Sequence, residues 1–584
     1  MIINLKPLYL TTVTLLFFTF QSFAQDKDNL GTEVVNVVKP YTPEIGDAFK
    51  VKATPQLGDS VNTAKKKVTY GIFSVPVAST FTPAKGRAEE IEKIKPPKLY
   101  DNYATLGFGT YESALAEFYT NFEIDRDRNF GIYLNHNSSQ GGIKDVVLDD
   151  KFYDTNLNFN YTSRDRYVNW ITDLELEHQL YNWYGVDELT RLATPQTING
   201  IDPTHSFYGA GLTTTVDVED SFFDSATATV RYFGDSEKSS EIRAIIEPKI
   251  EFPITDEKIN LDFKADYVNG KFDRNYDNSQ EINYSHLLIS GSPSLQVLRD
   301  NLTLNMGITV AVDLDTENSD TDFYFYPQVS ASYRLADEYF TPYAGVEGGL
   351  KQNSYRDFTQ QNPFVSPTLQ GMSPTDEKYN AFFGVKGKLS NALSYNLRGS
   401  YSAQDNEAFF LNNPRYEDGN GNVGNENYQY GNSFGVIFDD VRMLSFFGEI
   451  NADVNSNFKL RLNAEYFSYN TDAIAEAWNR PDYKASLFGD YQISEQWYAG
   501  TTLFLVGERM DQSAITGPFV SDNATTVTLD SYFDANAHLG YRFNEQLSVF
   551  GRVNNILDNS YEKWLNTPVQ GIQALLGATY KFDW

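Results

Sequence analysis

Five histidines are the residues best suited to metal binding or acid–base chemistry in this chain. They are His136, His178, His205, His286 and His538, and no two of them show the short spacing typical of metal ligands. His538 lies between apolar residues of an alternating segment, so we expect its side chain to face a polar interior. Cysteine is absent, which excludes disulfides, zinc–thiolate centres, a cysteine nucleophile and a lipid anchor on an N-terminal cysteine.

Two oxygen-rich segments could bind a hard cation such as Ca²⁺. Asp418-Gly419-Asn420-Gly421-Asn422 has oxygen side chains at alternate positions, but Val423 and Gln429 stand where a helix–loop–helix calcium site needs glycine and glutamate. We interpret this segment as a flexible external loop. The second segment contains Asp313, Asp315, Glu317, Asp320 and Asp322, and we interpret it as a solvated external loop. The sequence therefore predicts no metal ion and no other cofactor.

The sequence also lacks the usual signals of catalysis and of nucleic-acid binding. No glycine-rich phosphate loop follows a strand and opens a helix, and nothing points to a Ser/His/acid set. The formal net charge is −31, whereas a nucleic-acid-binding protein would be expected to present a basic face. We predict a protein that is neither an enzyme nor a partner of nucleic acid.

The dominant pattern is a strict alternation of apolar and polar residues, which predicts β-strands. In the last segment one face carries Ile572, Ala574, Leu576, Ala578, Tyr580, Phe582 and Trp584. The segment 533–543 alternates in the same way, and several others from residue 101 onward do too. Many of these segments run for roughly 10 to 15 residues, which suits a tilted transmembrane strand better than a strand of a soluble sandwich.

Composition favours a membrane barrel over a helical membrane protein. Aromatic residues make up 15% of the chain, yet its mean hydropathy is −0.43. No segment has the roughly 20 apolar residues that a spanning helix needs. Connections alternate between short and long, and about 22 strands fit between Asn102 and Trp584, although Phe434–Val454 could be one bulged strand or two. We predict an all-β fold, a transmembrane antiparallel β-barrel in the cell outer membrane that contacts outer-membrane lipid.

Two segments precede the predicted barrel of residues 101–584. Residues 1–24 resemble a signal peptide, with Lys6, an apolar core from Leu8 to Phe20 and small residues before Gln25. Residues 25–100 form a short, irregular, Pro-rich basic segment, with a net charge of +3 over residues 26–99. This segment is expected either to hang in the periplasm or to insert into the acidic lumen.

The C-terminal end resembles the TonB-dependent receptor family. Val553-Asn554-Asn555-Ile556-Leu557-Asp558-Asn559-Ser560-Tyr561-Glu562 is similar to that family's penultimate-strand motif, and Leu576–Phe582 is similar to its closing strand. The terminal aromatics Tyr580, Phe582 and Trp584 also resemble the signal that the barrel-assembly machinery recognises. Near the other end, Glu33-Val34-Val35-Asn36-Val37-Val38 resembles the short strand that such receptors offer to TonB by strand addition.

The resemblance implies a folded plug ahead of the barrel, but only about 75 residues separate the predicted cleavage site from Asn102, without a plug-like pattern. We therefore predict a barrel that lacks the plug and serves as an accessory subunit, with other outer-membrane proteins or surface lipoproteins as partners. The alternative is a TonB-dependent importer with a reduced plug, or a passive pore for a nutrient.

Overall fold

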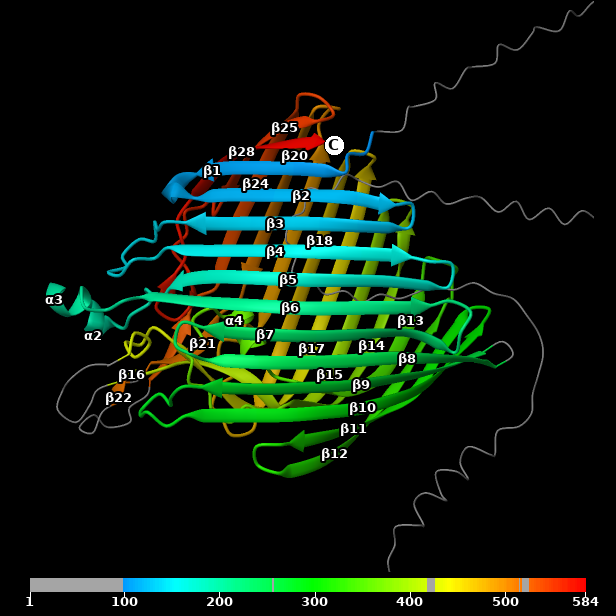
Figure 1. Cartoon of the computed structure of the whole chain (residues 1–584), viewed down its shortest axis with the longest axis horizontal. Coiled ribbons are helices and arrows are strands. Elements are labelled where there is room, and N and C mark those ends of the chain that lie inside the picture. The colour runs from blue at the N-terminus through cyan, green and yellow to red at the C-terminus, as the bar shows by residue number, and fades with distance from the viewer. Residues whose placement is uncertain (1–97, 255–256, 417–425, 514, 517–524) are drawn as a thin grey trace, which may run out of the picture. The chain divides into compact units, whose positions relative to one another are not determined.

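A computed structural model describes residues 98–254, 257–416, 426–513, 515–516 and 525–584. Twenty-two antiparallel strands form one sheet, and pairing of the first strand with the last closes it into a barrel (Figure 1). The predicted fold class and the predicted strand count are confirmed. No helix among the described residues is both long and apolar enough to cross a membrane.

The first half of the barrel consists of β1 (Asn102–Gly109), β2 (Ala114–Asp125), β3 (Arg128–Ser139), β4 (Phe152–Arg164), β5 (Val168–Asn182), β6 (Thr204–Val218), β7 (Phe223–Asp235), β8 (Ser240–Ile254), β9 (Glu257–Phe272), β10 (Ile282–Arg299) and β11 (Leu302–Asp315). The second half consists of β12 (Asp320–Tyr333), β13 (Thr341–Lys351), β14 (Thr375–Ser390), β15 (Leu393–Asn412), β17 (Phe434–Asn455), β18 (Phe458–Thr471), β19 (Tyr483–Gln492), β20 (Trp497–Val506), β24 (Tyr532–Arg542), β25 (Leu547–Asn554) and β28 (Gln573–Phe582).

Smaller elements lie in the connections between barrel strands. They are the 3₁₀ turn η1 (Thr110–Glu112), the helices α2 (Glu188–Arg191), α3 (Pro195–Ile198) and α4 (Tyr355–Gln361), and the short strands β16 (Arg415–Tyr416), β21 (Arg509–Ser513), β22 (Ile515–Thr516), β23 (Thr525–Leu529), β26 (Glu562–Trp564) and β27 (Thr567–Pro568).

The alternation read from the sequence determines which side chains face outward. In β28, Leu576 and Tyr580 are exposed on the outer wall, whereas Thr579 between them is buried. In β24, Phe533 and Leu539 are exposed on the outer wall, and the polar residues between them face inward. His538 therefore faces the lumen, as predicted. Apolar outward faces and polar inward faces are what a lipid-embedded barrel requires.

The two ends of the barrel differ in the length of their connections. Ten connections at one end have two to seven residues, for example 126–127 and 391–392. Connections at the other end reach 21 to 25 residues, for example 183–203, 352–374 and 507–531. Short turns face the periplasm in bacterial barrels, so we call the end with the long connections the external end.

The strand boundaries settle two segments that the sequence left open or suggested to be loops. The segment around Phe434–Val454 is one strand, β17, whose register against β15 shifts between Gln404 and Glu407. The supposed acidic loop is mostly strand, because Asp313 in β11 lies opposite Asp322 in β12 and only 316–319 form the turn. The signal peptide, most of the basic N-terminal segment and Asp418–Asn422 lie outside the described residues.

Candidate functional site

The external connections pack together around a hydrophobic cluster. The connection 352–374 contributes Tyr355, Phe358, Phe364, Val365, Leu369 and Met372, and other connections contribute Trp183, Tyr428, Leu529 and Leu565. Barrel residues at the external ends of the strands complete it, among them Phe207, Phe233, Phe272, Phe410 and Phe434. We call residues 352–374 and 426–433, together with Trp183, Leu529 and Leu565, the external cap.

Helix α4 places the cap across the lumen. Its Tyr355 ring lies 5.7 Å from Phe233 of β7 and 5.0 Å from Phe272 of β9, measured between ring centroids. Phe358, one turn further along, lies 5.9 Å from Phe410 of β15. The strand order places β7–β9 and β15 on widely separated walls of the closed ring. One seven-residue helix therefore contacts two distant walls at the external end.

A buried ion pair attaches α4 to β5. Arg356 Nε donates to Glu177 Oε1 at 2.6 Å, and Arg356 Nη2 donates to Glu177 Oε2 at 2.8 Å. Burial alone would lower the pKa of Arg356, but the hydrogen bonds and charge of Glu177 raise it above its ordinary value. Opposite Glu177 in the ladder stands Gly209, where a Cβ atom would lie only 2.3 Å from Glu177 Oε1. Glycine at this position leaves room for the carboxylate.

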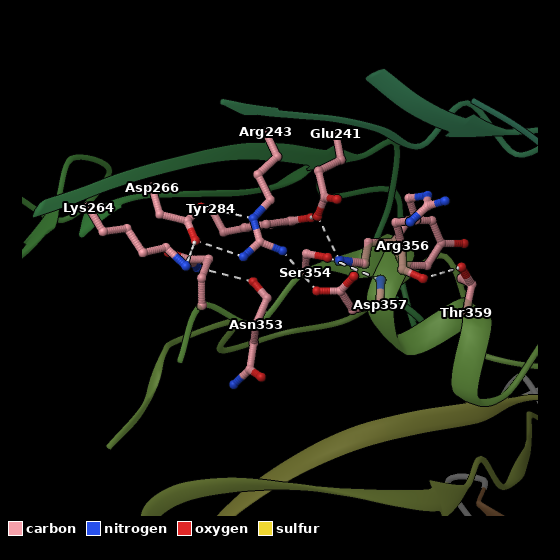
Figure 2. Close-up of polar contacts among 12 residues, drawn as sticks. Glu241, Arg243, Lys264, Asp266, Tyr284, Asn353, Ser354, Arg356, Asp357 and Thr359 are labelled. Atoms are coloured by element: carbon pink, nitrogen blue, oxygen red, sulfur yellow. Dashed lines mark hydrogen bonds and ion pairs between the residues drawn. The ribbon is translucent and has the colours of Figure 1, made fainter. Parts of the chain in front are cut away.

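A second ion pair attaches the next residue of α4 to β8 (Figure 2). Arg243 donates from Nε and Nη2 to both oxygens of Asp266, each at 2.8 Å, and from Nη1 to Asp357 Oδ2 at 2.8 Å. Lys264 Nζ lies 3.3 Å from Asp266 Oδ2. Because Asp266 is fully buried, its charge depends on these cations for compensation. Arg243 thereby links the barrel wall to the cap.

Tyr355 at the start of α4 is bonded to two buried carboxylates. Glu241 Oε2 accepts from the backbone N–H of Tyr355 and from Tyr284 Oη, both at 2.6 Å. Tyr355 Oη donates to Asp235 Oδ2 at 2.8 Å. Burial, and then the charge of Asp235, raise the pKa of the Tyr355 hydroxyl well above its usual range, so it remains a donor. The first turn of α4 is thus bonded to β7 and β8.

A second anchor lies in the hairpin β21–β23. Asp511 is fully buried and accepts from the backbone N–H of Asn412 at 3.0 Å and from Asn479 Nδ2 at 2.8 Å. Burial raises the pKa of Asp511 to about 6, in opposition to these hydrogen bonds. Arg509 in the same hairpin donates to the carbonyls of Lys563 and Glu562. The hairpin therefore joins three external connections.

The histidines are dispersed, and no group of three or more His, Asp or Glu side chains suited to a metal ion occurs among the described residues. Two histidines nevertheless lie in the external mouth. His286 Nδ1 is 3.1 Å from both oxygens of Asp313, and its Nε2 is 3.0 Å from the Met372 carbonyl. His205 stacks on Trp183 with ring centroids 4.2 Å apart. Asp313 is thus a buried partner of His286, which in turn contacts the cap, and its interpretation as a solvated loop residue was wrong.

The predicted site residues fall in two places. Glu33, Val34, Val35, Asn36, Val37 and Val38 lie outside the described residues. Tyr580 and Phe582 lie in the closing strand β28, and Trp584 follows it two residues later, where its Nε1 donates to Thr120 Oγ1 of β2 at 3.0 Å. Their role as an assembly signal stays a prediction.

Sequence reasoning missed the cap altogether. Arg356 and Glu177 are 179 positions apart, and no local pattern connects them. One local signal was available, since Ser354-Tyr355-Arg356-Asp357 has the spacing of a helix N-cap. Ser354 Oγ does accept the backbone N–H of Asp357 at 3.1 Å. That signal would have placed a helix inside an apparent loop, with an arginine and an aspartate on its first turn.

The family model described as "TonB dependent receptor-like, beta-barrel" matches residues 75–556. This chain belongs to the TonB-dependent receptor-like β-barrel family. No curated protein sequence matches it at a significant level. Membership of this family confirms the resemblance seen at the C-terminus and places the TonB-dependent receptor-like barrel in the outer membrane, as predicted.

Solved structures show the same fold at low sequence identity. The siderophore receptor PirA from Acinetobacter baumannii is 14% identical with a TM-score of 0.61, over 82% of this chain and 80% of that one. The pyoverdine receptor FpvA from Pseudomonas aeruginosa PAO1 is 12% identical with a TM-score of 0.61, over 84% and 80%. The ferric-catecholate import receptor Fiu from E. coli K12 is 12% identical with a TM-score of 0.57, over 84% and 82%.

These comparisons bear on the two functions predicted for this TonB-dependent receptor-like barrel. The family model that matches is described as TonB-dependent receptor-like, which is more consistent with the alternative, an importer. The comparisons give no support to an accessory subunit that has lost its plug, the function we favoured from the sequence. The supposed loss of the plug concerns residues ahead of Lys98, outside the described part of the chain.

Proposed function

We propose that this protein imports a solute across the outer membrane and that the external cap is its gate. The observation that carries the proposal is α4, which crosses the external mouth and is bonded to the wall through Arg356–Glu177 and Asp357–Arg243. A passive pore functions with its mouth open, whereas here a helix spans the external mouth and is held to the wall by these ion pairs. Gated import therefore fits the geometry better than free diffusion through a pore.

Charge at the external end indicates the class of solute. The described residues of the external connections include 22 Asp and Glu against 10 Lys and Arg, a net charge of −12. Such a field attracts cations and repels polyanions. Among the structural neighbours are a siderophore receptor and a ferric-catecholate import receptor. By that likeness we propose a ferric siderophore or a comparable chelate, of neutral or positive net charge, as the ligand.

Moving the cap costs free energy, because several buried polar contacts must break. Ligand binding at the external face would supply part of it. Engagement of TonB by Glu33–Val38 would supply the rest through strand addition, as the resemblance to the family implies.

An uptake experiment separates import from an accessory role. A deletion strain complemented with the full chain is supplied with ⁵⁵Fe as cationic, neutral or anionic hydroxamate chelates. We expect uptake of a neutral or cationic chelate to depend on the protein and on residues 33–38. Equal uptake with and without the protein for every chelate, together with stoichiometric copurification of other outer-membrane proteins, would instead establish the accessory role.

Planar bilayers test the gate itself. The purified full chain is expected to conduct poorly, and Arg356→Ala is expected to raise its conductance because the cap loses its bond to β5. Arg480→Ala is the matched control, since Arg480 forms a 2.6 Å ion pair with Glu407 at the same end without crossing the lumen. A large steady conductance of the unaltered protein would show a passive pore and refute gating.

A further inference from the structure

The seam between β12 and β13 is paired over only part of its length. Five register pairs join these strands, from Gln328↔Glu347 to Ser332↔Tyr343. On its other side, β12 pairs with β11 along its whole length, from Asp315↔Asp320 to Leu302↔Tyr333. The external half of β12, residues 320–327, therefore has no ladder partner on β13 among the described residues.

A proline in β12 and a bulge beside β13 explain why pairing stops here. Pro327 would form the next pair but has no N–H to donate. On the other side of β13, the register with β14 shifts between Glu347 and Gly349, and Lys378 and Tyr379 of β14 stand opposite the single residue Gly348, which is a β-bulge in β14. Beyond the bulge β13 follows β14 and leaves the edge of β12 unpaired.

The direction of the unpaired groups follows from the ladder. Arg334 N–H donates to the Asn301 carbonyl, so even-numbered residues of β12 bond toward β11 and odd-numbered residues direct their groups toward β13. Thr321 N–H is bonded to the Asp320 side chain. Phe323 and Phe325 consequently present backbone N–H groups to the open side of the seam. Both side chains are 67% exposed on the outer wall, at the external edge of its apolar surface.

The lumen side of the seam is closed by side chains instead of backbone. Tyr326 Oη donates to Asp376 Oδ1 of β14 at 2.8 Å, passing over Gly348, and Gln328 Nε2 donates to the Gly348 carbonyl at 2.6 Å. A Cβ atom at Gly348 would lie 2.9 Å from the Tyr326 ring. A foreign strand could not continue the ladder past Tyr326 without displacing it. The wedge is thus open toward the membrane and closed toward the lumen.

An apolar groove of about 690 Å³ lies on the outer wall directly below this wedge. Val329 and Val346 line it one residue from the point where pairing stops. Part of its lining consists of the small residues Ala331, Ala344 and Gly399, and the larger side chains of Phe383 and Phe446 also line it. Because this wall faces the outer membrane, the material available to fill the groove is an acyl chain.

We propose that the β12–β13 seam and the groove beneath it bind one outer-leaflet lipid. Its acyl chain fills the groove, and acceptor oxygens of its head, phosphate or ester, accept from the N–H groups of Phe323 and Phe325. Unpaired N–H groups at the edge of an apolar wall are costly, and a lipid of this kind satisfies them. The arrangement places the polar head outward and the chain toward the bilayer centre, as in the outer leaflet.

Native mass spectrometry with added palmitoyl-oleoyl-phosphatidylethanolamine tests the site on the detergent-purified full chain. Ala344→Phe fills the groove from an outward-facing position. We expect the one-lipid adduct to fall about tenfold, as when a bound chain loses roughly two methylene contacts. Val230→Phe, on the outer wall of β7, is the control and should retain the adduct. Equal amounts of the one-lipid adduct in the unaltered chain, Ala344→Phe and Val230→Phe would overturn the proposal. A copurifying peptide in place of lipid would overturn it too.

Cysteine crosslinking tests the open seam independently of groove filling, in a chain that has no cysteine of its own. Val329→Cys with Val346→Cys should form a disulfide in membranes, since these residues are ladder partners. Phe325→Cys with either Gly349→Cys or Leu350→Cys should not, because the strands diverge above the bulge. Equally rapid crosslinking above and below the bulge would show a closed seam and refute the site.

Discussion

Arg356 of α4 and Glu177 of β5 form a two-bond ion pair inside the external mouth, with both side chains at least nine-tenths buried. Charge-assisted bidentate pairs of this kind are the strongest hydrogen bonds that side chains make. The pair joins a connection between β13 and β14 to a strand far around the barrel. Each partner depends on the other, because a lone buried charge is costly.

Removing one partner should therefore release the cap. Arg356→Ala leaves the Glu177 carboxylate buried without its cation, a change that costs about 3–5 kcal/mol in comparable buried pairs. Thr359→Cys supplies a reporter, since Thr359 is buried in α4. Labelling by a water-soluble maleimide should be at least about tenfold faster with Arg356→Ala than without it. Thr359→Cys combined with Arg480→Ala should be labelled at the same rate as Thr359→Cys alone. Equal labelling rates for Thr359→Cys alone, with Arg356→Ala and with Arg480→Ala would show that the Arg356–Glu177 pair does not hold the cap.

Gly209→Ala should reproduce that effect without touching either charge. The added methyl group would lie 2.3 Å from Glu177 Oε1, so the carboxylate must move away from Arg356. We expect faster labelling at Thr359→Cys and a higher conductance. Gly349→Ala is the matched control, because a Cβ atom there has nothing within 4 Å. An effect of Gly349→Ala as large as that of Gly209→Ala would mean that loss of glycine itself, not contact with Glu177, disturbs the cap.

The hairpin β21–β23 should become more stable as the pH falls through about 6. Burial raises the folded-state pKa of Asp511 to about 6, so the folded hairpin binds this proton more tightly than the open one. The contribution is fully present below the ordinary carboxyl pKa and is lost as pH rises through 6, amounting to at most about 3 kcal/mol. Hydrogen exchange of residues 509–513, corrected for intrinsic rates, should show stronger protection at pH 5 than at pH 8.

Asp511→Asn provides the control for this pH dependence. Asparagine cannot ionise, so protection of residues 509–513 should become independent of pH between 5 and 8. If the variant retains the pH dependence, another group is responsible and the assignment to Asp511 is wrong.

The closing strand yields a prediction about assembly. If Tyr580, Phe582 and Trp584 form the signal for the barrel-assembly machinery, Phe582→Ala with Trp584→Ala should lower the amount of barrel in outer-membrane fractions severalfold. Phe543→Ala removes an exposed aromatic from a neighbouring turn and should leave the amount unchanged. A normal amount of the double variant on immunoblots would show that these residues are only lipid-facing side chains.

The alternating segments were enough to predict the strands of the barrel, because the side-chain period of a strand is fixed by backbone geometry. Leu576 and Tyr580 of β28 illustrate this, since both face outward as their positions in the sequence require. Pro327 could also have been read as the end of a ladder, because proline within a strand lacks the donor. These are local properties, and local properties are visible in a sequence.

The cap was not visible in the sequence for a different reason. Its contacts join residues brought close only after the barrel has closed, such as Tyr355 with Phe233 and Asp357 with Arg243. The connections look polar because their apolar residues are spread over five separate segments. Asp313 was misassigned for the same reason, since its partner His286 belongs to another strand and lies 27 positions away.

The register of Glu177 in β5 also has a consequence for the order of folding. Side chains alternate along a strand, so a slip of β5 by one residue would turn Glu177 toward lipid and leave Arg356 without a counter-ion. The cap can then settle only on a barrel that has already closed in the correct register. A barrel closed in the wrong register would lack this ion pair and leave its external connections without their anchor to β5.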